Sequence, residues 1–250
     1  MHQVTYELTE LTRYNRDGSY SSQAGRRAML TMIGDQLYEV LGYKQLHAHD
    51  LRGRHINKLL TLWRSQGIAD ATIRNRLVTL RWVLRKVGNP GAMAKENAAY
   101  GLAPRETVAT VSKAKSLPRD VLSRIPDAYV RASLEVQEQF GCRREEAIKL
   151  RPWQADQGTV LALQPSWCKG GRYREVPVRT LPQRALLDRL KTFVSTKDAS
   201  LIPAHLSYIQ QLRRYEYWCK RVGLHRMHGL RHGYVQARYL ELTGFPCPVC

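Results

Sequence analysis

Apolar side chains in the first part of the chain recur three or four residues apart, the spacing of amphipathic helices. Residues 1–19 are polar and predict an irregular start. Three helical stripes follow, made of Leu30, Ile33, Leu37, Val40 and Leu41, then Ile56, Leu59, Leu60 and Trp63, then Ile73, Leu77, Leu80 and Leu84. No strand pattern occurs before residue 100. The pattern therefore predicts a small helical domain over residues 1–103.

The second half of the chain mixes helical and strand patterns. Residues 159–163 and 174–178 predict two strands, with a glycine turn between them, and Pro177 confines the second strand to a sheet edge. Helices are expected at about 127–140, 143–150, 182–193, 204–222 and 229–243. Residues 104–117 predict a linker, which leaves 118–250 as a second domain. The expected fold class is mainly α with a small antiparallel β-sheet.

Charge adds a partner to this picture. The chain has 40 Lys and Arg against 21 Asp and Glu, a net charge of +19, and the excess is shared almost equally by both halves. Such a balance favours a polyanionic partner, and double-stranded DNA is the default. Arg74, Arg81 and Arg85 share one helix face. This face either follows a DNA backbone or is an ordinary solvated surface.

Other compositional signals concern the compartment and cofactors. No apolar run reaches the length of a membrane span, and no signal peptide opens the chain, so we expect no membrane association. Five scattered Cys argue against a disulfide framework and for a reducing cytoplasm. Cys247 and Cys250 have half of a zinc-site spacing, but no second such pair exists. We expect no metal and no other cofactor.

Three basic stretches carry the candidate chemistry. They are Gly141-Cys142-Arg143-Arg144-Glu145-Glu146, then Lys169-Gly170-Gly171-Arg172-Tyr173-Arg174-Glu175-Val176-Pro177, then His228-Gly229-Leu230-Arg231-His232. An Arg and a His on one helix face offer a bidentate fork of donors and a proton carrier, which suits a phosphate. A Lys at a hairpin tip can protonate an oxygen that leaves phosphorus. Taken alone, the first and third stretches are more often solvated basic surface, and the second is as compatible with a basic hairpin that only touches DNA.

Together and in this order, the three stretches resemble the boxes of the tyrosine recombinase (phage integrase) family. Those boxes read G-[LM]-R-x-x-E, K-x-G-[KR]-x-R-x-[VI]-P and H-x-L-R-H. The resemblance covers residues 118–250, and the integrases of bacterial mobile elements are the most similar members. The basic helical first half resembles the family's core-binding (SAM-like) domain less strongly.

The resemblance implies roles for these residues and a place for the protein. Arg143 and Arg231 would clamp the scissile phosphate, Lys169 would protonate the leaving 5′ oxygen, and His228 would assist proton transfer. His232 would support the cluster, and Glu146 would orient Arg143. Arg172 and Arg174 would join the helical arginines in binding DNA. The family also implies a tetramer on DNA, in the cytoplasm and at the bacterial nucleoid.

One departure from the family pattern concerns the nucleophile. The family's Tyr lies at least one helix beyond the third box, whereas only Tyr234 and Tyr239 follow Arg231 here, in the helix of the box itself. We therefore expect a recombinase without its own nucleophile, either a shortened gene product, a fragment, or a partner that receives Tyr in trans. The alternatives are a non-catalytic protein that occupies recombination sites and a basic RNA-binding or ribosome-associated protein.

Overall fold

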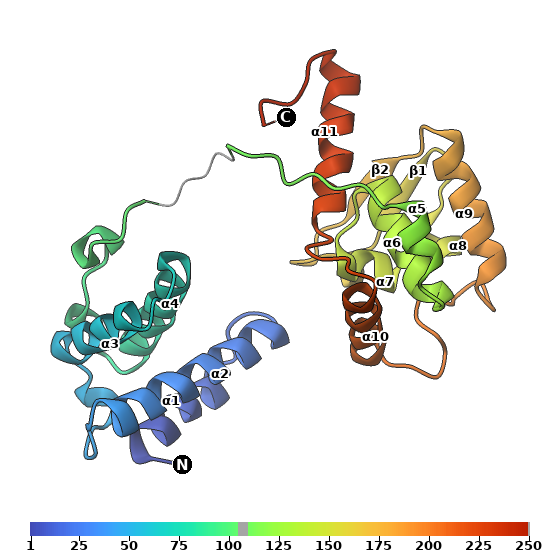
Figure 1. The fold of residues 1–250 in the computed structure, drawn as a ribbon. Helices are drawn as coiled ribbons and strands as arrows, with labels where there is room; N and C mark the ends of the chain where they lie inside the picture. Colours follow the sequence, from blue (N-terminus) through green and yellow to red (C-terminus); the bar gives the residue numbers. More distant parts are fainter. Residues whose placement is uncertain (105–109, 250) are drawn as a thin grey trace. The chain divides into compact units, whose positions relative to one another are not determined.

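The chain folds into two compact units, residues 1–107 and 108–250 (Figure 1). The computed structural model describes residues 1–104 and 110–249. Part of the predicted linker, residues 105–109, lies outside the described residues. Within the described part, no helix has both the length and the apolar character that crossing a bilayer requires.

The first unit is a helical bundle. Its helices are α1 (Gln3–Tyr14), α2 (Tyr20–Asp35), α3 (Gly53–Ser65) and α4 (Asp70–Lys86). The short helical turns η1 (Gln36–Val40) and η2 (Ala48–Asp50) lie between α2 and α3, and η3 (Pro90–Ala92) and η4 (Asn97–Tyr100) follow α4. The three predicted stripes form its core, and Ile33, Trp63 and Leu77 have no exposed surface. Val40 is exposed, because the π-helical turn η1 changes the residue period after Asp35.

The expectation of an irregular start was wrong, because α1 occupies most of residues 1–19. Its inner face holds only two fully buried apolar side chains, Val4 and Leu8, and the other buried positions are threonines. The hydroxyl of Thr9 donates to the carbonyl of Thr5 at 2.9 Å, so these polar side chains are satisfied by their own helix. Gly34 of α2 lets α1 approach closely, since a Cβ there would lie 2.7 Å from Thr5 Cα.

The second unit is mainly helical with one two-stranded sheet, which confirms the predicted fold class. Its elements are α5 (Arg119–Ser123), α6 (Ala128–Phe140), α7 (Arg144–Lys149), α8 (Pro152–Ala155), β1 (Val160–Leu163), η5 (Pro165–Trp167), β2 (Arg174–Pro177), α9 (Leu181–Phe193), α10 (Tyr208–Arg221) and α11 (Gly229–Thr243). The strands are antiparallel, with Leu163 opposite Arg174 and Val160 opposite Pro177.

Helix α6 contributes side chains to both hydrophobic cores of this unit. Val136 and Phe140 pack into a core shared with the sheet and α9, while Val130 and Leu134 pack into a core shared with α10 and α11. Asp127 caps the helix by accepting backbone N–H donors, and Gly141 ends it in the left-handed conformation at φ 57°. Because Gly141 leads directly into α7, this packing fixes the position of the first predicted box.

Helix α11 receives the chain that enters the second unit. The backbone N–H of Lys115 donates to the carbonyl of Gly229 at 3.0 Å, and Ser112 and Gln236 are joined by side-chain hydrogen bonds. A Cβ at Gly229 would lie 2.7 Å from the carbonyl oxygen of Lys113, and a Cβ at Gly233 would lie 2.7 Å from that of Lys115. The two glycines, four residues apart, therefore form a shallow groove that holds residues 113–115.

Candidate active site

The first predicted box forms the turn between α6 and α7. The backbone N–H of Arg143 donates to Oε2 of Glu146 at 2.7 Å, which satisfies a free donor at the start of α7. The side chain of Arg143 also binds this carboxylate, because its Nη1 donates to Oε1 of Glu146 at 2.7 Å. Glu146 has no exposed surface, whereas 40% of the Arg143 side chain is exposed. One end of the ion pair is thus fixed in the core while the guanidinium is presented at the surface.

Glu146 also binds an arginine from the sheet. Nη2 of Arg174, on β2, donates to its Oε2 at 2.6 Å. Burial alone would raise the pKa of Glu146, but the hydrogen bonds from Arg143 and the charge of Arg174 outweigh burial and hold this pKa below its ordinary value. A single buried carboxylate therefore stays ionised and orients two guanidinium groups from distant parts of the chain.

A third guanidinium comes from α11. Arg231 donates through Nη1 to the backbone carbonyl of Gly141, the residue at which α6 ends. Burial lowers the pKa of Arg231, and the positive charges of Arg174 and Arg143 lower it further. Because the carbonyl of Gly141 lies two residues before Arg143, the three arginines share one neighbourhood. Such a concentration of positive charge around one carboxylate favours binding of an additional anion.

Two histidines of the third box stand beside these arginines. The rings of His228 and His232 meet edge to face, with centroids 5.2 Å apart. Burial lowers the pKa of His228, and the nearby charges of His232, Arg231 and Arg143 lower it further. A neutral imidazole near neutral pH can accept a proton, so His228 is chemically equipped as a base at the edge of the arginine cluster.

The predicted hairpin lysine and its neighbour are exposed. Lys169 and Arg172 both lie in the connection between β1 and β2. Burial is the main cause of the raised pKa of Cys168, the residue just before the lysine. The charge of Glu146 raises this pKa further, and the charges of Arg174 and Arg143 lower it. The connection therefore starts within electrostatic reach of the cluster, and the lysine ammonium is carried on an exposed turn next to it.

Sequence reasoning did not foresee how Arg174 is used. It was predicted as a DNA contact, yet its side chain is only 27% exposed and its guanidinium is bound to Glu146. Its Nε is buried without a partner among the described residues. The signal was present, because Arg174 begins a strand in which Val176 faces the core, so the alternation of the strand turns Arg174 inward as well.

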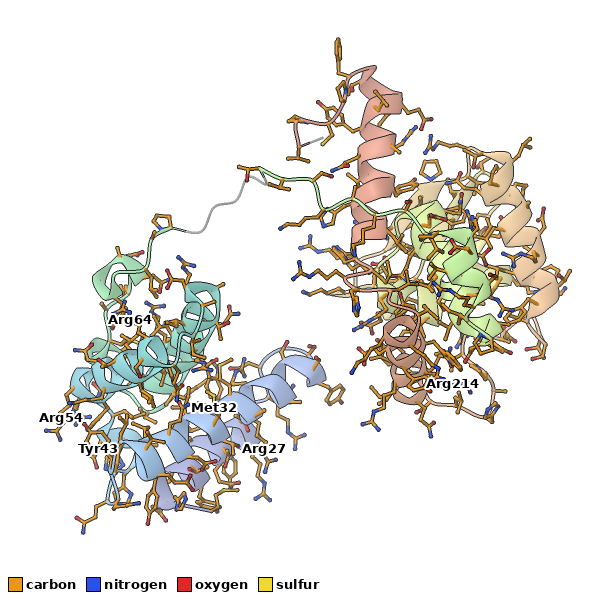
Figure 2. All side chains as sticks on the ribbon, in the orientation of Figure 1. Arg27, Met32, Tyr43, Arg54, Arg64 and Arg214 are labelled. Atoms are coloured by element: carbon orange, nitrogen blue, oxygen red, sulfur yellow. The ribbon has the colours of Figure 1, made fainter. Side chains whose placement is uncertain are left out.

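The three predicted DNA-binding arginines of α4 differ in their contacts. The guanidinium of Arg74 donates to the carbonyl of Ala103, and Arg81 donates to the carbonyl of Ala94 and to Oδ1 of Asn97. Arg85 is exposed. Figure 2 shows many other nitrogen-tipped side chains over both units, including Arg27, Arg54 and Arg214. Two of the three residues are therefore engaged with their own chain.

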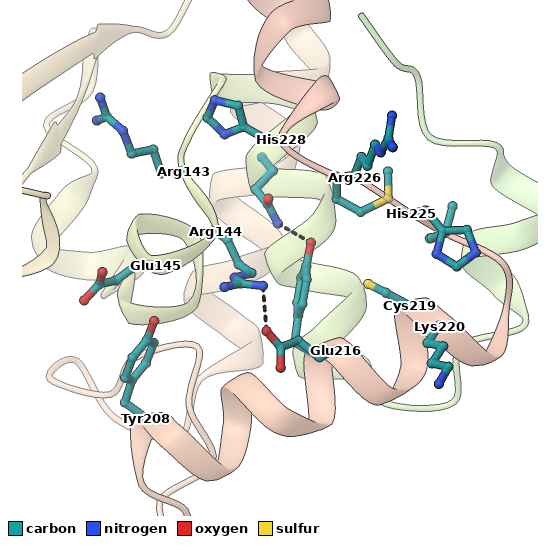
Figure 3. Close-up of a pocket in the computed structure, with 14 residues that line it drawn as sticks. Arg143, Arg144, Glu145, Tyr208, Glu216, Cys219, Lys220, His225, Arg226 and His228 are labelled. Carbon is teal, nitrogen blue, oxygen red and sulfur yellow. Dashed lines mark hydrogen bonds and ion pairs between the residues drawn. The ribbon is translucent and has the colours of Figure 1, made fainter. Parts of the chain in front are cut away.

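A pocket of about 650 Å³ adjoins the arginine cluster (Figure 3). It is lined on one side by Arg143 and His228 and continues over α10. Among the described residues, no three His, Cys, Asp or Glu side chains are grouped as metal ligands would be. Cys250 of the half zinc spacing lies outside the described residues.

Two family models match the chain. The family described as "Phage integrase, N-terminal" matches residues 1–92, and the family described as "Integrase" matches residues 103–237. No curated protein sequence matches the chain significantly.

Several solved structures share the fold. A lambda integrase (75–356) dimer bound to a COC′ core site is 16% identical with a TM-score of 0.63, covering 96% of this chain and 86% of that chain. The Tn1549 transposon integrase in complex with circular intermediate DNA is 13% identical with a TM-score of 0.59, covering 98% and 89%. XerH recombinase bound to palindromic difH substrate is 15% identical with a TM-score of 0.59, covering 95% and 74%. Because the integrase model spans more than half of the sequence, the chain belongs to the phage integrase family of tyrosine recombinases.

Proposed function

We propose that this protein binds duplex DNA and carries the phosphate-holding site of site-specific recombination. The observation that supports this most is the arrangement of three arginines at one turn: Arg143 and Arg174 bind the buried carboxylate of Glu146, and Arg231 donates to the carbonyl of Gly141. Two guanidiniums held in this way, those of Arg143 and Arg231, can neutralise the charge that develops on a phosphate under attack without moving during the reaction. The similar crystal structures contain a core site, a Holliday junction or difH DNA, and this is consistent with duplex DNA as the substrate of this protein.

The residues divide the reaction between them. Arg143 and Arg231 hold the non-bridging oxygens of the scissile phosphate, and Glu146 orients Arg143. As the oxygen of a tyrosine bonds to phosphorus, the bond to the 5′ oxygen breaks, and Lys169 gives its proton to that oxygen. His228 accepts the tyrosine proton, with His232 beside it. Attack by a 5′ hydroxyl on the phosphotyrosine runs the same steps in reverse and rejoins the strand.

Neither tyrosine of α11 is suited to be the nucleophile. The ring of Tyr234 is pressed against Gly141, where a Cβ would lie only 2.4 Å from its Cδ1. Tyr239 lies eight residues after Arg231, about 12 Å further along the helix axis at the rise of an α-helix. We therefore assign the nucleophile to neither residue, and we expect that the 250-residue polypeptide does not cleave DNA on its own.

The domains take complementary parts in this proposal. Residues 1–103 act as the core-binding domain, 104–117 connect, and 118–250 hold the phosphate. Several copies assemble on DNA, as in the lambda integrase tetramer bound to a Holliday junction. We further propose that the protein acts at the bacterial nucleoid. The second candidate is a non-catalytic protein that occupies recombination sites, and the placement of Tyr234 and Tyr239 favours it.

Orthovanadate, a phosphate mimic, tests the phosphate site without knowledge of the target sequence. At ten times its Kd it should raise the Tm of the native protein by about 4 °C. The Arg231→Ala variant should lose this shift, and Arg124→Ala, which changes an exposed arginine at the end of α5, should keep it. An equal shift in the Arg231 variant would exclude this site as the phosphate-binding site.

DNA binding and cleavage are tested separately. Affinity for a mixed-sequence duplex should fall steeply with salt, because many Lys and Arg release counterions from phosphates. A nicked duplex library that traps phosphotyrosine should give no covalent adduct on a denaturing gel. A flat salt response would contradict DNA binding, and an adduct would contradict our assignment of the nucleophile.

A further inference from the structure

The pocket beside the arginine cluster is formed by α6, α7, α10 and the segment that leads into α11 (Figure 3). Arg143 and His228 belong both to its wall and to the proposed phosphate site. The opposite part of the wall carries Lys220, His225 and Arg226. A strand of DNA whose scissile phosphate is held by Arg143 would therefore continue past this pocket or into it.

The charges that line the pocket leave a positive excess. Both of its carboxylates are already paired, since Glu216 accepts from Arg144 at 2.8 Å and Glu145 accepts from Lys149 at 2.5 Å. Among the described residues, neither Lys220 nor Arg226 has an acidic partner within ion-pair distance, although both line the same wall. The pocket consequently presents two uncompensated cations in addition to the shared Arg143.

The backbone of Arg226 has an uncommon conformation. Its φ of 54° makes it the one non-glycine residue with positive φ in the described part of the chain. A side chain with a Cβ is strained there, and glycine would adopt the same turn without strain. The turn buries Met227 in the core and leaves Arg226 and His228 exposed on either side of it. Such strain persists at sites where the side chain itself is needed.

We propose that Arg226, together with Lys220, holds a backbone phosphate of the DNA strand next to the phosphate gripped by Arg143 and Arg231. This inference rests on the proposed function and adds to it a second phosphate contact outside the three boxes. The strained turn places Arg226 two residues before His228 on the wall of the same pocket, so the neighbouring phosphate is bound when the scissile phosphate is in place.

The test uses two variants of the full chain and one control. Arg226→Gly removes the charge and the strain together, Arg226→Lys keeps the charge, and Arg124→Ala removes an exposed arginine elsewhere in the same unit. Duplex affinity is measured by fluorescence anisotropy at several salt concentrations, and Tm is measured for each protein.

Arg226→Gly should unfold at the same temperature as the native protein or higher, yet bind duplex DNA several-fold more weakly. Its salt dependence should be shallower by about 0.9 in the slope of log K against log salt, the loss of one phosphate contact. Arg226→Lys and Arg124→Ala should keep the native slope. A native slope in Arg226→Gly, or an equal loss in Arg124→Ala, would overturn this inference. The proposed function would fail differently, because the native protein itself would then show no salt-dependent binding.

Discussion

The arginines of the two units look alike in the sequence and differ in what they contact. In the first unit, Arg74 and Arg81 donate to carbonyls of the segment that follows α4, so they hold their own chain. In the second unit, Arg143 and Arg174 share one buried carboxylate and keep part of their guanidinium groups exposed. A carboxylate anchors an arginine and leaves its remaining donors for a ligand, and Arg231, although its own partner is the carbonyl of Gly141, lies beside the pair that is anchored in this way. The surroundings of an arginine, more than the arginine itself, distinguish a structural from a binding role.

The largest expected effect comes from removing the shared anchor. Glu146→Gln leaves Arg143 and Arg174 without the buried negative charge that they neutralise, and should lower the free energy of unfolding by about 3 kcal/mol in urea titrations. Glu216→Gln is the matched control, because that carboxylate pairs with Arg144 at the surface, and it should cost less than about 1 kcal/mol. Equal losses would mean that the buried carboxylate is no special anchor.

The turn that presents Arg143 should be nearly as sensitive. Gly141→Ala adds a Cβ in a left-handed conformation, at φ 57° and 2.4 Å from the ring of Tyr234, so we expect a loss of about 2–3 kcal/mol. Gly244→Ala shares the positive φ but meets nothing within 4 Å, and should cost about 1 kcal/mol. The difference in Tm between the two variants measures the contact itself, and similar values would refute the close packing of α11 on this turn.

Two arginines of α4 should separate structural from binding roles within the first unit. Arg81→Ala removes bonds to Ala94 and Asn97 and should lower the free energy of unfolding by about 1–2 kcal/mol. Arg85→Ala, at an exposed position, should leave stability unchanged and reduce the salt slope of duplex binding by about 0.9. The reverse pattern would show that bonding within the chain does not predict the role of these residues.

The smallest expected effect is a pH dependence of the first unit. His55 is buried, and its Nδ1 accepts the backbone N–H of Arg52 at 3.0 Å. Burial lowers the pKa of His55 below its ordinary 6.5, and Arg54 and Arg52 lower it further. The folded state thus favours the neutral ring, so this contribution to stability is present above about pH 6.5 and is lost as the pH falls toward the folded-state pKa.

A Tm series from about pH 8 to pH 5 measures that dependence. His55→Asn keeps an acceptor near the same backbone N–H and removes the titrating ring, so its series should be flatter than that of the native protein. His49→Gln, at an exposed position, should follow the native series. If the His55 variant also follows it, His55 does not control the acid response.

Periodicity predicted most of the fold, because the stripes around Ile33, Trp63 and Leu77 are long and contain few polar residues. It failed for α1, where threonines fill the inner face and only long-range contact with Gly34 shows that they are buried. The helix does carry an apolar period, Val4, Leu8 and Leu11, but it is short and the buried threonines between these residues weaken it. The π-helical turn was hidden for a similar reason, since nothing local marks the change of register that exposes Val40.

The candidate site was foreseen as a set of residues and not as an arrangement. The three boxes name Arg143, Lys169 and Arg231, which remain predictions until they are tested in solution. Strand alternation indicates that Arg174 turns inward, but the sequence does not say that it meets Glu146, because that depends on how the sheet lies against α7. The role proposed for Arg226 was equally invisible, since neither its positive φ nor the pairing of the nearby carboxylates can be read from the sequence.

The groove formed by Gly229 and Gly233 has a mechanical consequence for α11. This helix offers one side to residues 113–115 and another to the Gly141 turn, where Arg231 donates its hydrogen bond. A methyl group added at either glycine would push residues 113–115 away from α11 or rotate α11 about its own axis. Such a rotation would carry the guanidinium of Arg231 away from the carbonyl of Gly141. A substitution on the side of α11 that faces residues 113–115 would therefore disturb the side that faces the Gly141 turn, without any contact between the two sites.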